Sequence, residues 1–197
     1  MRSLVVIENV SLDGVMQGPA RADEDTRGGF TAGGWAVPHM ARDPEAAMAS
    51  MEGMGETTAM LFGRFSYEDM CGYWLNTSDP NPYSEIFRST TKYVASRTLS
   101  EPLEYPSSRL LRGDAVEAVR LLKAEGDGTI AVLGSGDLVR QLLAAGLVDE
   151  LVLSTVPVVL GQGVTLFGET PVTLEAVSVR AFDSGITVGR YRVSHEA

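Results

Sequence analysis

The residues that can do chemistry in this sequence stand directly after short apolar runs. The first group is Gly63-Arg64, which follows the run from Ala59 to Phe62. The glycine allows a sharp turn, and Ser66 can cap a helix that begins there, which leaves free backbone amides beside the Arg64 guanidinium. Such an arrangement favours a phosphate group. The alternative is a surface arginine that pairs with Glu68 along a helix.

The second group is Ser96-Arg97-Thr98, at the end of the run from Tyr93 to Ser96. Two hydroxyls and a guanidinium can donate several hydrogen bonds to one phosphate monoester, such as the 2′-phosphate that distinguishes NADP from NAD. An ordinary polar turn is the alternative, and the sequence alone leaves it open.

The third group, residues 134–138, reads Gly-Ser-Gly-Asp-Leu and follows the buried-type run from Ile130 to Leu133. Glycines here let a pyrophosphate approach backbone amides, and the start of a helix adds positive potential. The pattern departs from the Rossmann fingerprint because Val139 replaces the third glycine and no acidic residue follows at the usual distance. It indicates a pyrophosphate site, with a plain strand-to-helix turn as the alternative.

Short β-branched runs separated by turns and helix-period segments must position these groups. The continuous hydrophobicity of residues 4–7 and 130–133 predicts strands buried on both faces, as in a mostly parallel sheet covered by helices. The architecture is therefore α/β. The predicted strands are Leu4 to Val10, Ala59 to Phe62, Tyr93 to Ser96, Ile130 to Leu133 and Leu151 to Val159.

Capping residues and turns delimit the other predicted elements. Helices are expected from Asp114 to about Glu125, from Asp137 to Ala145 before Gly146, and from Pro44, after Asp43, to about Met54. Alternating apolar residues beyond Val172 predict an antiparallel hairpin around residues 183–185. The glycine-rich segment 17–34 is predicted to be a long functional loop.

Composition limits the class of protein. The 197 residues fit one domain, spanning 1–197, and 16 Lys and Arg against 26 Asp and Glu give a net charge of −10. We therefore expect no binding to nucleic acid or to a membrane. One cysteine permits neither a disulfide nor a zinc cluster, so no metal is expected, and the compartment is predicted to be cytoplasmic.

The order of the motifs along the chain carries a resemblance to a known family. Residues 11–14 read Ser-Leu-Asp-Gly, the three groups above follow in order, and residues 146–151 read Gly-Leu-Val-Asp-Glu-Leu. This order resembles the dihydrofolate-reductase-like superfamily, and most closely the reductase (C-terminal) domain of the bifunctional riboflavin-biosynthesis deaminase-reductase. The resemblance implies a three-layer fold: a central mixed, mostly parallel sheet of about eight strands, helices on both faces and a C-terminal antiparallel hairpin.

The same resemblance assigns cofactor roles. It implies NADPH as the cofactor, with the end of the first strand beside the nicotinamide, Arg64 at the adenosine phosphates, residues 96–98 at the 2′-phosphate and residues 134–136 at the pyrophosphate. The residues expected to bind the cofactor are Val10, Gly14, Gly63, Arg64, Ser96, Arg97, Thr98, Gly134, Ser135, Gly136, Asp137 and Leu138.

Four residues are candidates for the substrate side. Asp13 and Asp43 are the catalytic candidates, although an Asp-Gly pair is also an ordinary turn and Asp43 is also a suitable helix N-cap. Trp35 can stack on a planar heterocycle or clasp the first helix, and His39 can donate a proton or be a polar loop residue.

The sequence therefore predicts an NADPH-dependent reductase acting on a pyrimidine or pterin-like small molecule. By resemblance, the substrate is the ribosylaminopyrimidine phosphate of riboflavin synthesis (5-amino-6-(5-phosphoribosylamino)uracil) or a dihydrofolate-like pterin, and the protein is a homodimer. A phosphoribosyl substrate requires a second cationic patch, for which Arg21, Arg27 and Arg42 are available. Zinc deaminase motifs are lacking, so no deaminase activity is expected. The alternatives are a non-catalytic NADP-binding or sensory module and an NAD-dependent dehydrogenase of Rossmann type.

Overall fold

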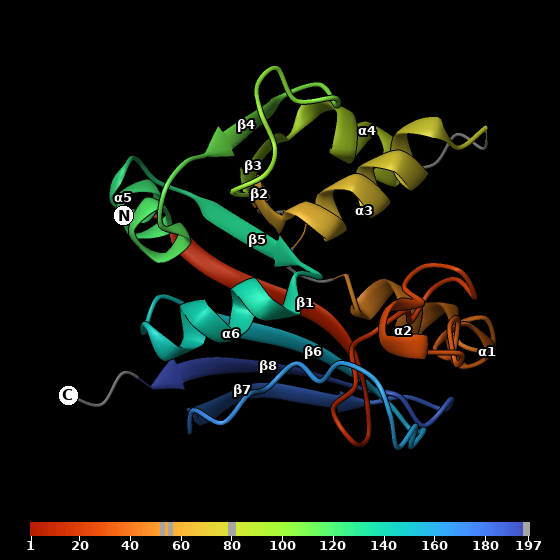
Figure 1. Cartoon of the computed structure of the whole chain (residues 1–197). Helices are drawn as coiled ribbons and strands as arrows, with labels where there is room; N and C mark the ends of the chain where they lie inside the picture. Colours follow the sequence, from red (N-terminus) through yellow and green to blue (C-terminus); the bar gives the residue numbers. More distant parts are fainter. Residues whose placement is uncertain (52–53, 55–56, 79–81, 195–197) are drawn as a thin grey trace.

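A single eight-stranded sheet organises the computed structural model, which describes residues 1–51, 54, 57–78 and 82–194. The strand order is β4-β3-β2-β5-β1-β6-β8-β7 (Figure 1). Pairing is parallel from β4 to β6, whereas β8 runs antiparallel to both β6 and β7. The sheet is thus mixed and mostly parallel, and its antiparallel part is the C-terminal hairpin.

The strands alternate with helices along most of the chain. The strands are β1 (Ser3–Ser11), β2 (Thr57–Gly63), β3 (Thr91–Ala95), β4 (Ser108–Leu111), β5 (Thr129–Leu133), β6 (Glu150–Val156), β7 (Thr173–Ala181) and β8 (Thr187–Ser194). The helices are α1 (Val37–Met40), α2 (Pro44–Ala49), α3 (Arg64–Asn76), α4 (Pro82–Ser89), α5 (Ala115–Ala124) and α6 (Gly136–Ala144), with a short 3-10 turn at Arg27–Gly29.

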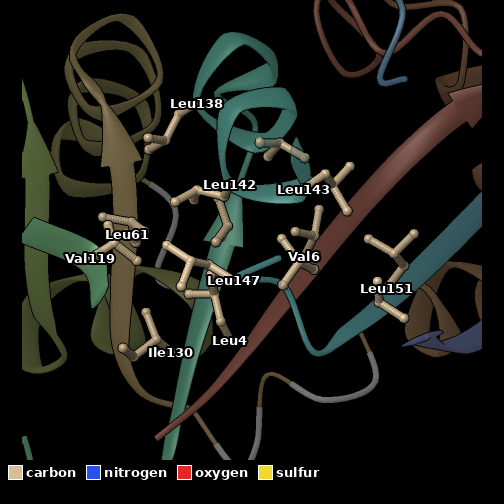
Figure 2. Packing of buried hydrophobic residues seen from close by; sticks show 14 of the residues in the cluster. Leu4, Val6, Leu61, Val119, Ile130, Leu138, Leu142, Leu143, Leu147 and Leu151 are labelled. Carbon is tan, nitrogen blue, oxygen red and sulfur yellow. The ribbon is translucent and has the colours of Figure 1, made fainter. Parts of the chain in front are cut away.

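Two apolar clusters, one on each face of the sheet, form the core. Leu4 and Val6 of β1 pack with α5 and α6 (Figure 2), whereas Val5 and Ile7 pack with helices α2, α3 and α4 on the other face. Alternate residues of one strand therefore enter different clusters, which explains why the sequence of this strand is continuously apolar rather than alternating. The predicted three-layer α/β architecture is confirmed.

Several predicted boundaries are wrong, for identifiable reasons. The strand expected to reach Val159 ends at Val156, because Pro157 has no amide to donate to a ladder. The helix expected to reach Met54 ends at Ala49, and residues 52 and 53 of the predicted span lie outside the described residues. Ser66 does not cap α3, whose N-cap is Gly63, and its hydroxyl accepts a hydrogen bond from the Ser135 amide instead.

The helices of the described chain are short. None of them is long and apolar enough to cross a membrane.

Candidate functional site

A cavity of about 1480 Å³ lies where the parallel strands end. Its strand-end half is lined by the residues that follow β2, β3 and β5 and by the start of α6. Its loop half is lined by residues 17–21, 24, 25, 27, 28 and 30, by parts of α1 and α2, and by the face of α3 that carries Asp69 and Tyr73. Carboxyl ends of parallel strands meet at one edge of a sheet, so segments far apart in sequence converge here.

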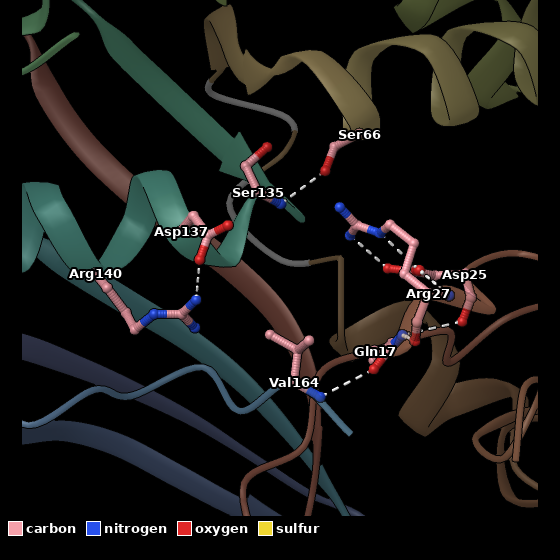
Figure 3. A network of polar contacts seen from close by, with 8 residues as sticks. All are labelled: Gln17, Asp25, Arg27, Ser66, Ser135, Asp137, Arg140 and Val164. Carbon is pink, nitrogen blue, oxygen red and sulfur yellow. Dashed lines mark hydrogen bonds and ion pairs between the residues drawn. The ribbon is translucent and has the colours of Figure 1, made fainter. Parts of the chain in front are cut away.

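The corner between β5 and α6 has an unusual backbone. Gly134 has φ of +59° and Ser135 has φ of +63°, the left-handed region that a non-glycine residue rarely adopts. A Cβ on Gly134 would lie 2.7 Å from the Ser66 hydroxyl oxygen. The Ser135 amide donates to that oxygen at 2.7 Å (Figure 3), and the Ser135 hydroxyl accepts from the Gly63 amide at 2.8 Å. Side-chain hydrogen bonds thus fasten the ends of β2 and β5 to each other.

The start of α6 is suited to a pyrophosphate. The first-turn amides of a helix have no intrahelical acceptors, and they carry the positive end of the helix dipole. Gly136 opens α6, and a Cβ there would lie 2.7 Å from Met16 Sδ. Glycine therefore lets Met16 pack against the start of α6, and both residues line the cavity that would receive a diphosphate.

Arginines stand at the ends of β2 and β3. Arg64 Nε donates to Glu68 at 2.9 Å, and its Nη1 donates to the Thr98 hydroxyl at 3.0 Å. The Glu68 pairing considered from the sequence is therefore present, although Arg64 also lines the cavity. Ser96 and Arg97 line the cavity too, and Arg97 forms no ion pair within the described part of the chain. Arg97 is thus an available cation for a phosphate.

Gln17 anchors the glycine-rich loop. Its side-chain amide donates to the carbonyls of Asp25 and Arg27, at 3.2 and 2.9 Å, and its Oε1 accepts from the Val164 amide at 3.0 Å (Figure 3). The Trp35 indole donates to the Gln17 carbonyl at 2.8 Å and is buried. Trp35 therefore holds the loop and is not among the cavity-lining residues.

The arginines of the loop half are already paired. Arg21 meets Asp69 at 2.5 Å and lies over the Tyr73 ring, 4.5 Å from its centroid. Arg27 binds Asp25 through two nitrogens, at 2.8 and 2.6 Å. Arg42 is exposed and does not line the cavity. The three arginines do not form the unpaired cationic patch that a phosphoribosyl group requires.

Glu8 is the most unusual cavity residue, and sequence reasoning missed it. It is 8% exposed, and its Oε1 is buried without a hydrogen-bond partner among the described residues. Burial raises the pKa of Glu8 well above its usual value; the Gly134 amide partly opposes this, and Glu24 adds to it. The available signal was a carboxyl group within a strand whose neighbours are buried on both faces.

The two catalytic candidates lie outside the cavity lining. The Asp13 carboxylate accepts from the Ser11 hydroxyl and from the Gly161 and Leu160 amides, and these bonds lower its pKa to about 2. Asp43 caps α2 by accepting from the Ala46 amide at 3.0 Å, and it also accepts from the Ser184 amide.

The predicted site residues divide into two sets. Those that do not line the cavity are Val10, Asp13, Gly14, Trp35, His39, Asp43 and Thr98. Those that the structure brings together in its lining are Gly63, Arg64, Ser96, Arg97, Gly134, Ser135, Gly136, Asp137 and Leu138. No group of acidic, histidine or cysteine side chains in the described ranges is arranged to hold a metal ion.

Comparisons with known proteins identify the family and the fold. The chain is 32% identical over 149 residues to the uncharacterized protein YyaP of Bacillus subtilis (strain 168), covering 73% of this chain and 77% of that protein. A putative riboflavin biosynthesis protein from Shewanella sp. PV-4 superposes with a TM-score of 0.65 at 21% identity, over 99% of this chain and 100% of that one.

Dihydrofolate reductase from Enterococcus faecalis, solved with NADP(H), superposes with a TM-score of 0.61 at 16% identity, over 98% and 96% of the two chains. The fold is therefore dihydrofolate-reductase-like. The model of the RibD C-terminal domain matches residues 2–188. This chain belongs to the RibD C-terminal domain family, the reductase family that the order of its motifs indicated.

Proposed function

We propose that this protein is an NADPH-dependent reductase that transfers a hydride to a C=N or C=O group of a planar heterocyclic substrate. One observation carries the proposal. Arg97, which forms no ion pair in the described part of the chain, the start of α6 and the buried Glu8 line the same cavity. Membership of a reductase family supports the same reading.

The strand-end half fits the phosphates of the dinucleotide. In this proposal the start of α6 binds the pyrophosphate through its amides, and Arg97 with Ser96 binds the 2′-phosphate. Arg64 binds the adenosine phosphates and is oriented by Glu68 and Thr98, which it already contacts. When bound, NADPH supplies the hydride from C4 of its nicotinamide.

Reduction of C=N or C=O also needs a proton. Glu8 is the acid between the two halves, because its pKa is affected by the Gly134 amide of the strand-end half and by the Glu24 charge of the loop half. Its raised pKa favours the protonated form, from which Glu8 donates a proton to the substrate nitrogen or oxygen and then recovers one from solvent. Asp13 holds the turn after β1 through the amides it binds.

A binding test decides the cofactor. We expect NADPH to bind about tenfold or more tightly than NADH in a fluorescence titration, because only NADPH offers a phosphate to Arg97. Equal affinities would contradict the assignment. Steady oxidation of NADPH in the presence of a pyrimidine or pterin then separates a reductase from a non-catalytic NADP-binding module, which shifts NADPH fluorescence without turnover.

The Rossmann-type dehydrogenase is excluded by topology. A doubly wound dinucleotide domain has the strand order 3-2-1-4-5-6 in an open, mostly parallel sheet. Here β1 lies between β5 and β6, and the chain ends in the antiparallel pair of β7 and β8.

We also propose that the protein forms a homodimer through β7. This strand lies at the edge of the sheet, and Val177 and Val179 on it are about half exposed. A nine-residue exposed edge strand is a template for pairing with another chain. Light scattering during size-exclusion chromatography tests this: the wild-type protein should elute as a dimer, and a Val179→Lys variant as a monomer.

A further inference from the structure

The loop half of the cavity carries more negative than positive charge. Its lining and the adjoining Glu8 provide four carboxyl groups and two guanidinium groups. Each guanidinium group is paired with a carboxylate, so the two arginines add no net positive charge to this half. The carboxyl groups are Glu8, Glu24, Asp25 and Asp69, and the guanidinium groups are Arg21 and Arg27.

The carboxyl groups lie close enough to repel one another. The Glu24 charge raises the pKa of Glu8, and the Asp69 charge raises that of Glu24, in each case after the larger effect of burial. A phosphate brought into this region would add a further negative charge to a site with no free cation. Its binding is therefore opposed by repulsion and by desolvation of the phosphate itself.

Glu8 indicates which group a ligand must offer. Glu8 lines the cavity, and its Oε1 is buried and has no hydrogen-bond partner among the described residues; an unsatisfied buried polar atom is unfavourable unless a ligand completes it. A ligand N–H placed against Oε1 satisfies it, and a positive charge on the ligand is attracted by the carboxylates beside Glu8. The apolar and aromatic walls, among them Phe30, Tyr73 and Trp74, suit a flat ring.

We propose that the loop half binds an unphosphorylated nitrogen heterocycle, uncharged or cationic, one of whose N–H groups is recognised by Glu8. This inference rests on the proposed reductase function and narrows its substrate class. It differs from the phosphoribosyl substrate that family resemblance implies, because the arginines needed for that phosphate are already neutralised within the protein.

The test uses a matched pair of probes on the full chain saturated with NADP⁺. Cytidine and cytidine 5′-monophosphate differ only in the phosphate, so calorimetric titration isolates its effect. We expect cytidine to bind at least about tenfold more tightly than the monophosphate. Tighter or equal binding of the monophosphate overturns the proposal, and so does failure of both probes to bind at about 10 mM.

Two variants test the physical cause. Asp69→Asn releases Arg21, so the affinity for the monophosphate should rise about tenfold while that for cytidine is retained. Glu85→Gln, which releases Arg88 from an exposed pair on α4, is the matched control and should change neither affinity. No gain with Asp69→Asn overturns the charge argument.

Glu8→Met tests the recognition step. It keeps approximately the volume of the side chain but removes both carboxyl oxygens, and we expect cytidine binding to weaken about tenfold. Unchanged cytidine binding overturns the role of Glu8. NADP⁺ affinity is measured separately on each variant. The Asp69→Asn comparison is also made without the dinucleotide. A wild-type chain that does not bind NADP⁺ therefore contradicts the proposed function but leaves this inference testable.

Discussion

Gly136→Ala should separate cofactor binding from folding. The wild-type backbone at Gly136 is not in the left-handed region, so alanine can adopt it without strain. The new Cβ would lie 2.7 Å from Met16 Sδ and 3.3 Å from Arg140 Nη1, both near the far ends of flexible side chains. These ends can shift, and alanine favours helix over glycine by up to about 1 kcal/mol. We therefore expect the free energy of unfolding to change by less than about 1 kcal/mol.

The displaced Met16 and Arg140 side chains both line the cavity beside the start of α6, so their shift should disturb the proposed pyrophosphate contact there. Loss of one hydrogen bond to a charged group amounts to about 1.5–3 kcal/mol. Since 1.4 kcal/mol corresponds to a factor of ten, NADPH should bind roughly 10- to 150-fold more weakly to Gly136→Ala. A fluorescence titration with NADPH measures the affinity, and urea denaturation measures the stability.

Gly168→Ala is the matched control. Its Cβ would also press on Arg140, at 2.9 Å from Cδ, but Gly168 does not line the cavity. We expect NADPH affinity within about twofold of the wild type. If Gly136→Ala folds normally and binds NADPH as tightly as the control, the pyrophosphate does not lie at the start of α6, and the assignment of the cofactor site is refuted.

Three further predictions concern charged groups. Arg97→Ala should weaken NADPH binding about tenfold and leave NADH within about twofold, measured by fluorescence titration. As pH rises above about 4.3, the ordinary pKa of a glutamate, Glu8→Gln should lose less stability than the wild type, as followed by urea denaturation at each pH. The folded state holds the Glu8 proton more tightly because burial raises its pKa, so this contribution is complete below the unfolded pKa and is lost as pH rises through the folded one; each unit of difference contributes about 1.4 kcal/mol. Asp149→Ala should destabilise by roughly 2–4 kcal/mol in urea, because Lys123, buried and 2.5 Å from Asp149, loses its counter-charge.

Each of these has a result that would contradict it. Equal losses for NADPH and NADH in Arg97→Ala would mean that Arg97 does not meet the 2′-phosphate. Parallel pH profiles for the wild type and Glu8→Gln would mean that Glu8 is ionised at the same pH in both states. A change below about 1 kcal/mol in Asp149→Ala would mean that Lys123 finds water or another partner.

Much of the fold was predictable because burial leaves a strong pattern in sequence. The continuous apolar runs of β1 and β5 predicted a covered parallel sheet, and Asp114 predicted the start of α5, whose Glu117 amide it caps at 3.0 Å. Elements with weaker patterns were predicted less well. A helix was expected after Gly63 but without an end, because α3 buries only Tyr67 and Cys71 and its sequence shows little helical amphipathicity. The four-residue strand β4, which lacks a fully buried residue, was missed.

The part of the candidate site that glycines and strand ends form was predictable, whereas the part that depends on burial was not. The residues after β2, β3 and β5 were found because glycines, hydroxyls and arginines at strand ends have few other uses together. Glu8 was missed because the sequence shows a charged residue but not the loop that covers it. The pairing of Arg21 was likewise hidden, since Asp69 is 48 residues from Arg21 along the chain.

The contrast between the two halves of the cavity also fixes how a dinucleotide can lie in it. The protein has a net charge of −10, so phosphates are attracted only where arginines and helix amides are locally unopposed. Arg97 and the start of α6 provide such a place, whereas the carboxyl groups of the loop half repel phosphate. In the proposed complex the phosphates therefore lie in the strand-end half, and the uncharged dihydronicotinamide end points toward Glu8. Raising the salt concentration should weaken the attraction of the dinucleotide to Arg97 more than any contact of a neutral substrate with Glu8, because only the former joins opposite charges at an exposed position.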